Sequence, residues 1–449
     1  PDEILQEIET GLDFFEAESA NLPDRQQSIL HVFDYSWEHL SPTEQAIFMK
    51  MSVFRGGFSR QAGQTITGAT LRQFMSLMNR SLLLRDPETG RYSIHALLRQ
   101  YAEEKLKRYG DEAGLVVEHA KYYASALARQ MPQLASPQQL TSMKNIELDS
   151  ENVRVAWLKS LKMGRYDVMD TMLHGLWIYY ISRDQQMMVD DLFAPLYAVV
   201  NQTKHPSPQL QQLWQRVIFR WAGAYQTAPH RAKFPVHIRA VQSLVEQIDD
   251  VYERAVGQYC LGWYFTVTND MPSSQTHLRI SDALLAQLDE KYLRSIVLAR
   301  LGFIEIVNGN QDAFLIYAEH SVKLTEELGV SIQRFAPLNN LGAVAFFLGD
   351  YEEARRRFYE TSVLISQSRY YTMVFPFSNL ALIDFITGDF EASQRMLTKI
   401  DKLVGSAFST SGYGLALAVK GMLLTTQGRY AEGLEAGQRS FDYASNVSV

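Results

Sequence analysis

Three arginines stand at one register in the C-terminal part of the chain, where their type and spacing could do chemistry. Arg254, Arg294 and Arg334 follow one another at equal intervals. Guanidinium groups hold carboxylates and phosphates through charge-assisted hydrogen bonds, so a ladder of them would suit an anionic ligand or an acidic peptide. The alternative is that these arginines are simply solvated at helix starts.

The motifs of common enzymes are missing from the sequence. The ten histidines form no H-E-x-x-H pair, and Cys260 is the only cysteine, which excludes a Cys-rich zinc site and a disulfide framework. A lone cysteine also favours a reducing, cytoplasmic compartment. The sequence contains neither a G-x-x-x-x-G-K-[ST] phosphate loop nor a G-x-S-x-G elbow. We therefore expect no catalytic residue and no metal in this chain.

Composition and charge are those of a globular protein that does not coat nucleic acid. The 449 residues are 46% hydrophobic and 21% charged, with a net charge of -7, and this length suggests two to four domains. No uncharged apolar run reaches the ~18–20 residues of a membrane span. Residues 1–25 hold eight acids and one base, whereas residues 26–108 hold eleven bases and seven acids. Only the second block is mildly basic.

The steps in the sequence pattern predict a winged helix in the N-terminal part. Residues 1–25 show helical apolar spacing. In the next block Ser41, followed by Pro42 and then Glu44, is a helix start with a capping box. A further helix is expected over residues 71–79. Two short apolar runs around a Pro/Gly turn, within residues 82–94, predict a β-hairpin.

An internal repeat with a period of about 40 residues fills the C-terminal part. Small residues recur at Gly262, Gly302, Gly342, Ala381 and Gly421. Seven residues after each comes a turn residue, namely Asn269, Gly309, Gly349, Gly388 and Gly428. A small residue lets two helices approach closely, and the turn residue ends the first helix, so the period predicts an α-solenoid of two-helix units. Weaker copies fit Gly175 and Gly223.

The expected fold class is all-α with a small β wing, and four regions follow from the pattern. Residues 1–25 form a helical segment, and residues 26–108 form a winged-helix domain. Residues 109–215 form a linking helical region with degenerate repeats. The clear repeats occupy residues 216–449.

Several segments also carry the motifs of a known family. They are Ser28–Trp37, Leu40–Gln45, Ser52–Phe58, Ser81–Leu83, Tyr92–Ala102 and Glu147–Arg154, followed by the repeat Leu341–Ala354. The first five segments resemble the winged-helix block of bacterial STAND signal-transduction ATPases, which are related to NB-ARC proteins. The sixth resembles the lead-in to the repeats of that family, and the last resembles a lengthened tetratricopeptide repeat.

This resemblance implies that the chain is the C-terminal half of a larger switch, and the start at Pro1 fits an excised fragment. ATP or ADP with Mg would belong to a module before residue 1, so we expect no cofactor here although the intact protein would be an ATPase. Residues 1–25 would end the helical domain that follows that module. The repeats would bind a signal protein, peptide or small molecule. The winged helix would relay the signal to the nucleotide-binding domain, and oligomerisation would follow.

The resemblance assigns a role to His95. It matches the histidine of the family's Met-His-Asp-type motif, which reaches the nucleotide diphosphate in the intact protein, and an imidazole can donate to a phosphate oxygen. Ala96 stands where the family has Asp, so part of the usual support is missing. The alternative is a histidine packed at the junction of wing and helix.

The resemblance also selects residues for a ligand groove. In tetratricopeptide folds the first helix of each unit lines the concave surface, through positions three before and one, four and five after the small residue. The aromatic and polar residues at these positions are Tyr259, Trp263, Phe303, Ile306, Asn339, Phe346, Phe347, Ser378 and Phe385. Such a mixture suits a peptide, protein or small-molecule ligand. The alternative is that many of them form the core between repeats.

Two other functions remain open. The winged helix could bind DNA through Arg72 and Arg80 on its third helix. The modest positive charge and the apolar neighbours Phe74, Met75 and Leu77 do not favour this. The repeats could instead form an interaction scaffold without a switch. Salt-dependent binding to duplex DNA would separate the DNA regulator from the other two.

Overall fold

The computed structural model describes residues 33–182, 187–224, 238–368, 374–404 and 412–447. The helix expected over residues 1–25 lies outside the described residues. Contacts divide the chain into two compact units. Unit 1 comprises residues 1–129 and 144–172, and unit 2 comprises residues 130–143 and 173–449. No helix of the described ranges combines the length and the apolar character that crossing a bilayer requires.

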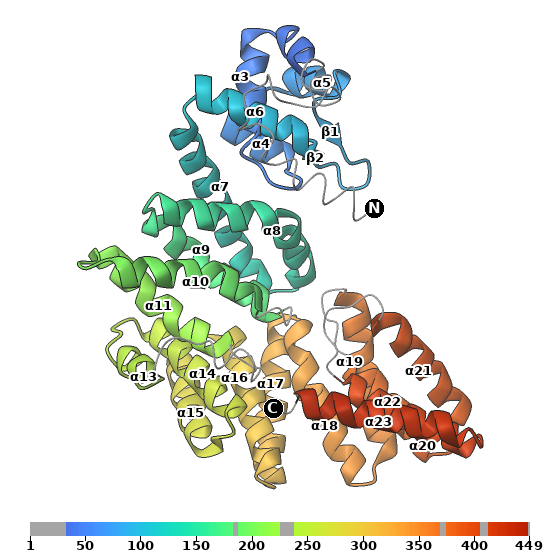
Figure 1. Ribbon diagram of the computed structural model, residues 1–449. Coiled ribbons are helices and arrows are strands. Elements are labelled where there is room, and N and C mark those ends of the chain that lie inside the picture. Colours follow the sequence, from blue (N-terminus) through green and yellow to red (C-terminus); the bar gives the residue numbers. More distant parts are fainter. Residues whose placement is uncertain (1–32, 183–186, 225–237, 369–373, 405–411, 448–449) are drawn as a thin grey trace. The chain divides into compact units, whose positions relative to one another are not determined.

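Unit 1 contains the helices and the small hairpin of the expected winged helix. Its elements are α3 (Pro42–Met51), α4 (Arg60–Thr67), α5 (Leu71–Asn79), β1 (Leu84–Arg85), β2 (Tyr92–Ser93) and α6 (Ala96–Tyr109). The strands pair antiparallel, with Leu84 opposite Ser93, and form the wing (Figure 1). The described part of the chain is therefore all-α with a small β wing, as the sequence predicts.

Local sequence explains how these elements begin and turn. The Ser41 side chain accepts the Glu44 N–H, and the Glu44 carboxylate accepts the Ser41 N–H, so the predicted capping box is confirmed. In the wing, the carboxylate of Asp86 accepts the N–H groups of Glu88 and Thr89 at 2.8 and 2.9 Å. This turn reverses the chain between the two predicted runs.

Three helices contribute residues to both units. They are α7 (Glu112–Leu134), α8 (Gln139–Lys162) and α9 (Tyr166–Ser182). The division after residue 129 gives the last turn of α7 to unit 2, and the division at residue 144 does the same for the first turn of α8. The end of α7 and the start of α8 thus belong with the repeats.

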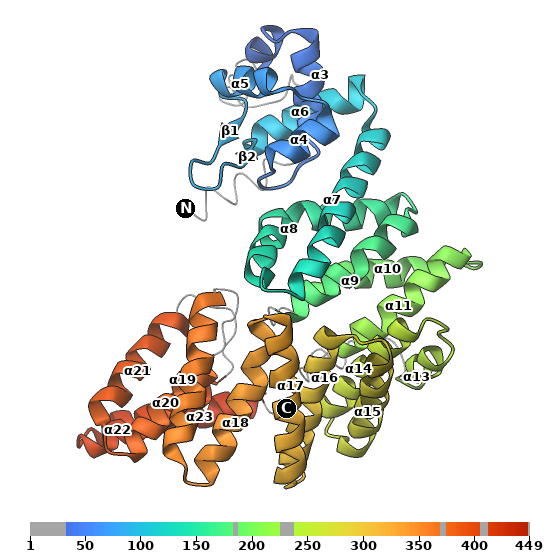
Figure 2. The ribbon, with the colours of Figure 1, turned by 180° about the vertical axis from the view of Figure 1, so that it is seen from behind.

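Unit 2 continues as α10 (Met187–Gln202), α11 (Pro208–Ala224) and α13 (Ile238–Glu246), followed by five helix pairs. The pairs are α14 (Val251–Val267) with α15 (Met271–Gln287), α16 (Lys291–Val307) with α17 (Gln311–Leu328), α18 (Phe335–Phe347) with α19 (Tyr351–Ser368), α20 (Phe375–Ile386) with α21 (Phe390–Val404), and α22 (Tyr413–Thr426) with α23 (Tyr430–Val447). Partners within a pair pack against each other (Figures 1 and 2). A short 3₁₀ helix, η3 (Ile332–Arg334), precedes α18.

The repeat residues act as their spacing predicts. All five turn residues have left-handed backbones, with φ from 62° at Asn269 to 84° at Gly388, which ends the first helix of each pair. A Cβ added at Gly262 would lie 2.6 Å from Leu278 of the partner helix, and one at Gly342 would lie 2.8 Å from Phe358. The small residues therefore permit the close approach of paired helices.

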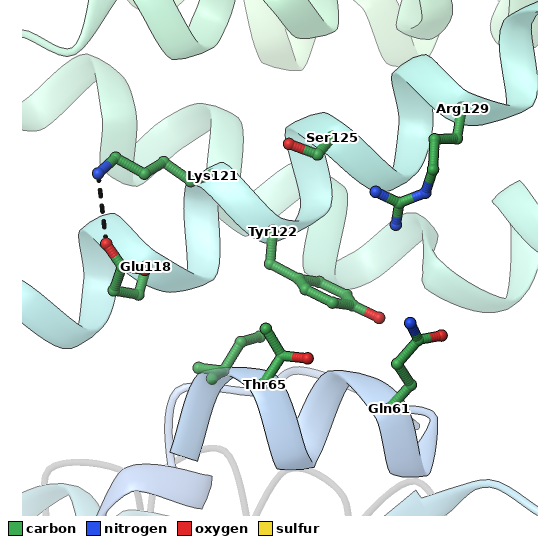
Figure 3. Close-up of a pocket in the computed structure, with 8 residues that line it drawn as sticks. Gln61, Thr65, Glu118, Lys121, Tyr122, Ser125 and Arg129 are labelled. Carbon is green, nitrogen blue, oxygen red and sulfur yellow. Dashed lines mark hydrogen bonds and ion pairs between the residues drawn. The ribbon is translucent and has the colours of Figure 1, made fainter. Parts of the chain in front are cut away.

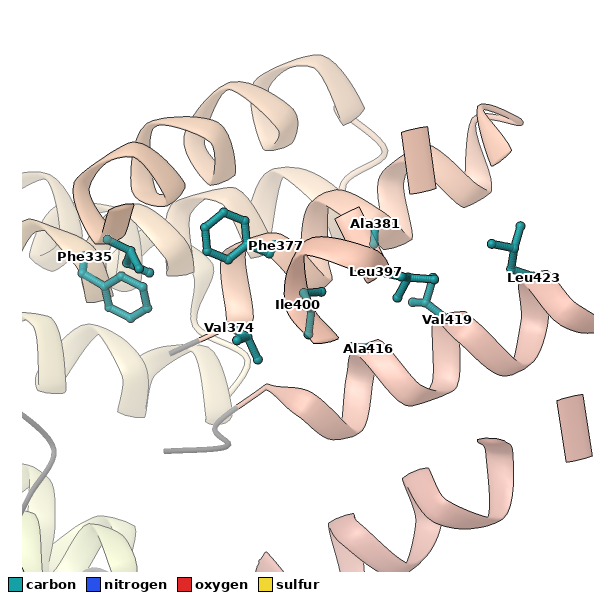
Figure 4. Packing of buried hydrophobic residues seen from close by; sticks show 10 residues of the cluster. Phe335, Val374, Phe377, Ala381, Leu397, Ile400, Ala416, Val419 and Leu423 are labelled. Atoms are coloured by element: carbon teal, nitrogen blue, oxygen red, sulfur yellow. The ribbon is translucent and has the colours of Figure 1, made fainter. Parts of the chain in front are cut away.

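Apolar residues from successive pairs form continuous clusters between the helices. One cluster joins α18, α20, α21 and α22 through residues that include Phe377, Ala381, Ile400 and Val419 (Figure 4). Each is nearly or fully buried. One pair alone could not bury such a face, so neighbouring repeats stabilise one another.

Candidate functional site

The first helices of successive pairs expose a row of large apolar side chains. These residues stand one or five positions after the small residue of their repeat. We call the set the apolar stripe, and its members are Phe303, Val307, Phe347, Ile386 and Met422. Their exposed fractions run from 38% at Phe303 to 82% at Phe347. Helical positions four apart share a face, so Phe303 and Val307 lie on one face of α16, and the stripe is a candidate apolar surface for binding.

The structure divides the predicted groove residues among different environments. Phe303 and Phe347 lie in the apolar stripe. Tyr259 and Ser378 are buried, because their position faces a neighbouring helix rather than open space. The Ser378 hydroxyl donates to Val374 and Gly412 carbonyls at 3.1 and 3.0 Å, and the Tyr259 ring lies 6.0 Å from that of Trp177. These two residues are therefore removed from the expected surface.

Four more of the predicted groove residues pack or bond between repeats. Ile306, Phe346 and Phe385 are partly buried and pack against hydrophobic clusters. Asn339 is half-buried and accepts a hydrogen bond from the amide of Asn379 at 3.3 Å. For all four, the interpretation as packing between repeats fits better than an open groove.

Trp263 stacks against Arg300, a residue that the sequence analysis did not select. The guanidinium carbon of Arg300 lies 3.6 Å from the centre of the Trp263 ring, a cation–π contact. The Trp263 Nε1–H is buried and has no hydrogen-bond partner among the described residues. The indole nitrogen is closed to solvent, so the half-buried Arg300 guanidinium is the donor of this pair that can meet a ligand oxygen. Arg300 stands two residues before Gly302. This position in the repeat is the feature of the sequence from which the contact could have been predicted.

The predicted arginine ladder is largely neutralised by internal pairs. Arg294 pairs with Asp282 at 2.7 Å. Arg334 pairs with Glu326 at 3.1 Å and with Glu360 at 2.9 Å. Arg254 lies half-buried in the first turn of α14, whereas Arg334 ends η3 before its helix. The common register in sequence therefore does not place the three in equivalent helical positions, and ion pairing explains two of them.

In the winged helix, His95 caps a helix at an exposed position. It is the N-cap of α6, and its Nδ1 accepts the Leu97 N–H at 3.4 Å. Ala96 opens the helix behind it. The ring is exposed, so it is not packed into the junction. Its predicted contact with a nucleotide remains a prediction.

Helix α5 offers a mixed surface. Arg72 and Arg80 are exposed, while Phe74 and Leu77 belong to the core. Met75 on the outer face is 54% exposed. The outer face thus combines two cations with apolar side chains, whereas DNA grooves favour polar and charged contacts.

A buried polar network in unit 1 fixes α8 to the winged helix. We call it the Asn152 network. The Asn152 side chain accepts the Arg55 N–H at 2.8 Å and donates to the Gly57 carbonyl at 3.1 Å. Its oxygen also lies 3.3 Å from Nε2 of His119. Burial lowers the pKa of His119 to about 4, so near neutral pH the neutral ring donates to Asn152.

Two ion pairs reinforce the Asn152 network. Arg91 pairs with Asp149 at 2.5 Å and donates to the Leu148 carbonyl at 2.9 Å. Arg55 pairs with Glu103 at 3.2 Å. Burial raises the pKa of Asp149 although Arg91 opposes the shift. The segment Glu147–Arg154, noted in the sequence as a family-like motif, therefore attaches α8 to the segment around Gly57 and to the wing.

A second polar network fixes the start of α8 to the repeats in unit 2. We call it the Gln139 network. The Gln139 oxygen accepts the N–H groups of Ser331 and Ile332, each at 3.0 Å. Its amide donates to the Leu134 carbonyl at 3.0 Å and to Gln333 at 2.5 Å. Gln333 in turn donates to the Tyr292 hydroxyl at 2.6 Å. Sequence reasoning missed this network because its partners are far apart along the chain.

A buried ion cluster between α11 and α14 is structural. Arg220 and Arg216 each lie 2.7 Å from the carboxylate of Glu253. Burial would raise the pKa of Glu253, but the two guanidinium groups lower it to about 2. Arg220 and Glu253 are buried, so the cluster holds the two helices together and is closed to a ligand.

Comparison with known sequences gives a partial match. No family model matches the chain. A stretch of 143 residues is 32% identical to one protein of Mycobacterium bovis and two of Mycobacterium tuberculosis, all provisionally named HTH-type transcriptional regulators. The match covers 30% of this chain and spans 16% of the length of those relatives.

Two solved structures show a remote likeness. One is a STAND protein with a tetratricopeptide repeat sensor from Pyrococcus horikoshii, at 14% identity and a TM-score of 0.43, covering 92% of this chain and 65% of that one. The other is BtubC from P. vanneervenii, at 11% identity and a TM-score of 0.38, covering 50% and 91%. Both scores lie below 0.5, so neither structure informs the function of this chain.

Proposed function

We propose that this chain is the sensing and relay part of a larger regulatory protein. The repeats of unit 2 bind a signal, and α8 passes the change to the winged helix of unit 1. One observation carries the proposal. The same helix holds Gln139, which is bonded to η3 in unit 2, and Asn152, which is bonded to the winged helix in unit 1. In this proposal, a displacement of either residue moves the other because both belong to the continuous helix α8.

The apolar stripe supports a signal that presents apolar side chains. Phe347 and Val307 are more than half exposed, and burying such groups is favourable by about 25 cal/mol per Å². The half-buried guanidinium of Arg300, which stacks on Trp263, adds a donor for an oxygen atom of the ligand. A protein or peptide segment with an apolar face and an acidic group fits this surface best.

The wider assignment rests on the motif resemblance to STAND ATPases. In the intact protein, ATP or ADP with Mg would bind an upstream module, and His95 would contact the nucleotide. Signal binding would favour one of two arrangements, since a ligand with equal affinity for both shifts nothing. Nucleotide exchange and oligomerisation would follow in the cytoplasm. The chain described here would itself carry no ATPase activity.

A DNA-binding regulator is the second candidate, favoured by the provisional name of the mycobacterial relatives. Fluorescence anisotropy with labelled duplex DNA at 50 and 200 mM salt tests it directly. Specific or non-specific binding through Arg72 and Arg80 would weaken steeply with salt. A flat titration at low salt would eliminate this candidate for the chain.

The relay is tested by amide hydrogen exchange on the full chain and its Gln139→Ala variant. Loss of the side chain leaves the Ser331 and Ile332 N–H groups without their acceptor, so exchange should rise in residues 329–335 by about tenfold or more. If α8 relays the change, exchange should also rise in residues 52–58, which contact Asn152. Gln138→Ala is the matched control, because Gln138 is exposed and its side chain bonds only Ser136 in the described structure.

The distribution of the effect decides the outcome. A rise at both segments in Gln139→Ala, and at neither in Gln138→Ala, supports the relay. A rise confined to residues 130–143 and 329–335 would show that the repeats and the winged helix are energetically independent, and the scaffold function would replace the proposal.

A further inference from the structure

A cavity in unit 1 lies between the second helix of the winged helix and α7. It is an open depression of about 350 Å³ between α4 and α7, and most of its lining residues are exposed. Its polar lining includes Gln61 and Thr65 from α4, and Lys121, Tyr122, Ser125 and Arg129 from α7. The α7 residues recur at three- and four-residue steps, which puts them on one helical face. Neither of the polar networks that hold α8 uses these side chains.

The two cations that line the cavity, Lys121 and Arg129, differ in whether an acidic side chain pairs with them. Lys121 pairs with Glu118 on its own helix at 3.3 Å. Arg129 has no acidic partner within the described residues, so it is the cation that the lining leaves uncompensated. Figure 3 shows its guanidinium group, the Tyr122 hydroxyl and the Gln61 amide directed toward the same space. The cavity therefore gathers hydrogen-bond donors around one free positive charge.

The tyrosine remains a donor under ordinary conditions. Burial raises the pKa of Tyr122, and this outweighs the hydrogen bond from Ser59 and the charges of Arg129 and Arg91, which act in the opposite direction. A protonated phenol is neutral and can donate a hydrogen bond to an anion, whereas a phenolate would repel it. An arginine fork, a phenol and an amide together match the oxygen atoms of phosphate or carboxylate.

We propose that this cavity binds a small oxyanion, a phosphate or a carboxylate, through Arg129, Tyr122 and Gln61. The depression is small and open to solvent, which suits a single anionic group with a few attached atoms rather than a polymer. The bound anion would link α4 to α7 inside unit 1. This site is separate from the apolar stripe and does not depend on the function proposed for the repeats.

The test is isothermal titration calorimetry on the full chain with sodium phosphate and with sodium acetate. Sodium chloride at matched ionic strength is the reference. Saturable binding of at least one oxyanion is expected in the wild type. Arg129→Gln should weaken it at least tenfold, because it removes the uncompensated charge and the forked donor. Tyr122→Phe should weaken it about threefold to tenfold, since one hydrogen bond is lost.

A variant that should raise the affinity for the oxyanion makes the test more specific. Glu118→Gln removes the acid that lines the cavity and frees Lys121, so the oxyanion should bind about twofold to threefold more tightly. Arg72→Gln is the matched control, an exposed arginine of unit 1 on α5 outside the cavity, and should leave affinity unchanged. Circular dichroism checks that each variant folds.

Either anion binding with these responses supports the site, and the preferred anion identifies the ligand group as phosphate or carboxylate. The proposal is overturned if neither anion binds beyond chloride. It is equally overturned if Arg129→Gln binds as the wild type does.

Discussion

The Asn152 and Gln139 networks attach the same helix to different parts of the chain by different chemistry. Each centres on one buried carboxamide that satisfies backbone groups of a distant segment. Around Asn152 stand a histidine and two ion pairs, formed by Arg55 and Arg91. The hydrogen bonds of Gln139 in the described structure involve only backbone groups and the Gln333 amide.

This difference predicts that the two networks respond differently to pH and salt. A carboxamide can accept and donate at once, so it replaces backbone partners that an irregular segment lacks. A neutral network responds little to pH or salt, whereas one with a buried histidine and partly exposed ion pairs responds to both. The attachment of α8 to the winged helix should therefore depend on solution conditions, and its attachment to the repeats should not.

The largest effect is expected from Asn152→Ala. The variant leaves the Arg55 N–H and the His119 ring without their partner and leaves the Gly57 carbonyl with Arg91 alone, which should cost about 3 kcal/mol. Exchange protection in residues 52–58 should fall roughly 100-fold. Glu151→Ala is the control, since Glu151 makes a surface pair with Arg154. Unchanged protection in residues 52–58 would mean that the network does not hold α8.

Acid should loosen the Asn152 network through His119. Its pKa is about 4 in the folded chain and about 6.5 when unfolded. The folded state therefore disfavours the protonated ring, and stability present above pH 6.5 is lost as pH falls toward 4, by on the order of 2–3 kcal/mol. Exchange in residues 52–58, corrected for intrinsic rates, should rise between pH 7 and 5. His119→Gln should abolish this dependence, and an equal slope in that variant would contradict the assignment.

The smallest effect is expected from salt. The pairs Arg55–Glu103 and Arg91–Asp149 are partly exposed, so raising NaCl from 0.1 to 1 M should weaken the Asn152 network by less than about 1 kcal/mol. Protection in residues 329–335, near Gln139, should not change. A larger salt effect at the Gln139 segment than at residues 52–58 would reverse the comparison.

Much of the fold could be predicted from local sequence because its causes are local. The capping box at Ser41, the turn before Gly90 and the left-handed residues that end five helices depend on neighbours a few positions away. The candidate site was less predictable. Position in the repeat found Phe303 and Phe347 but also Ser378, which is buried because it meets Gly412 at the start of the next repeat.

The sequence by itself determined that this chain is helical, that it carries a small wing, and that helix pairs repeat at a regular interval. It could not determine which side chains remain exposed or which polar groups meet. Gln139 contacts residues 331–333, and Asn152 contacts Arg55 and Gly57. Periodicity and capping act over a few residues of chain, whereas burial and hydrogen bonding depend on segments that only tertiary packing brings together.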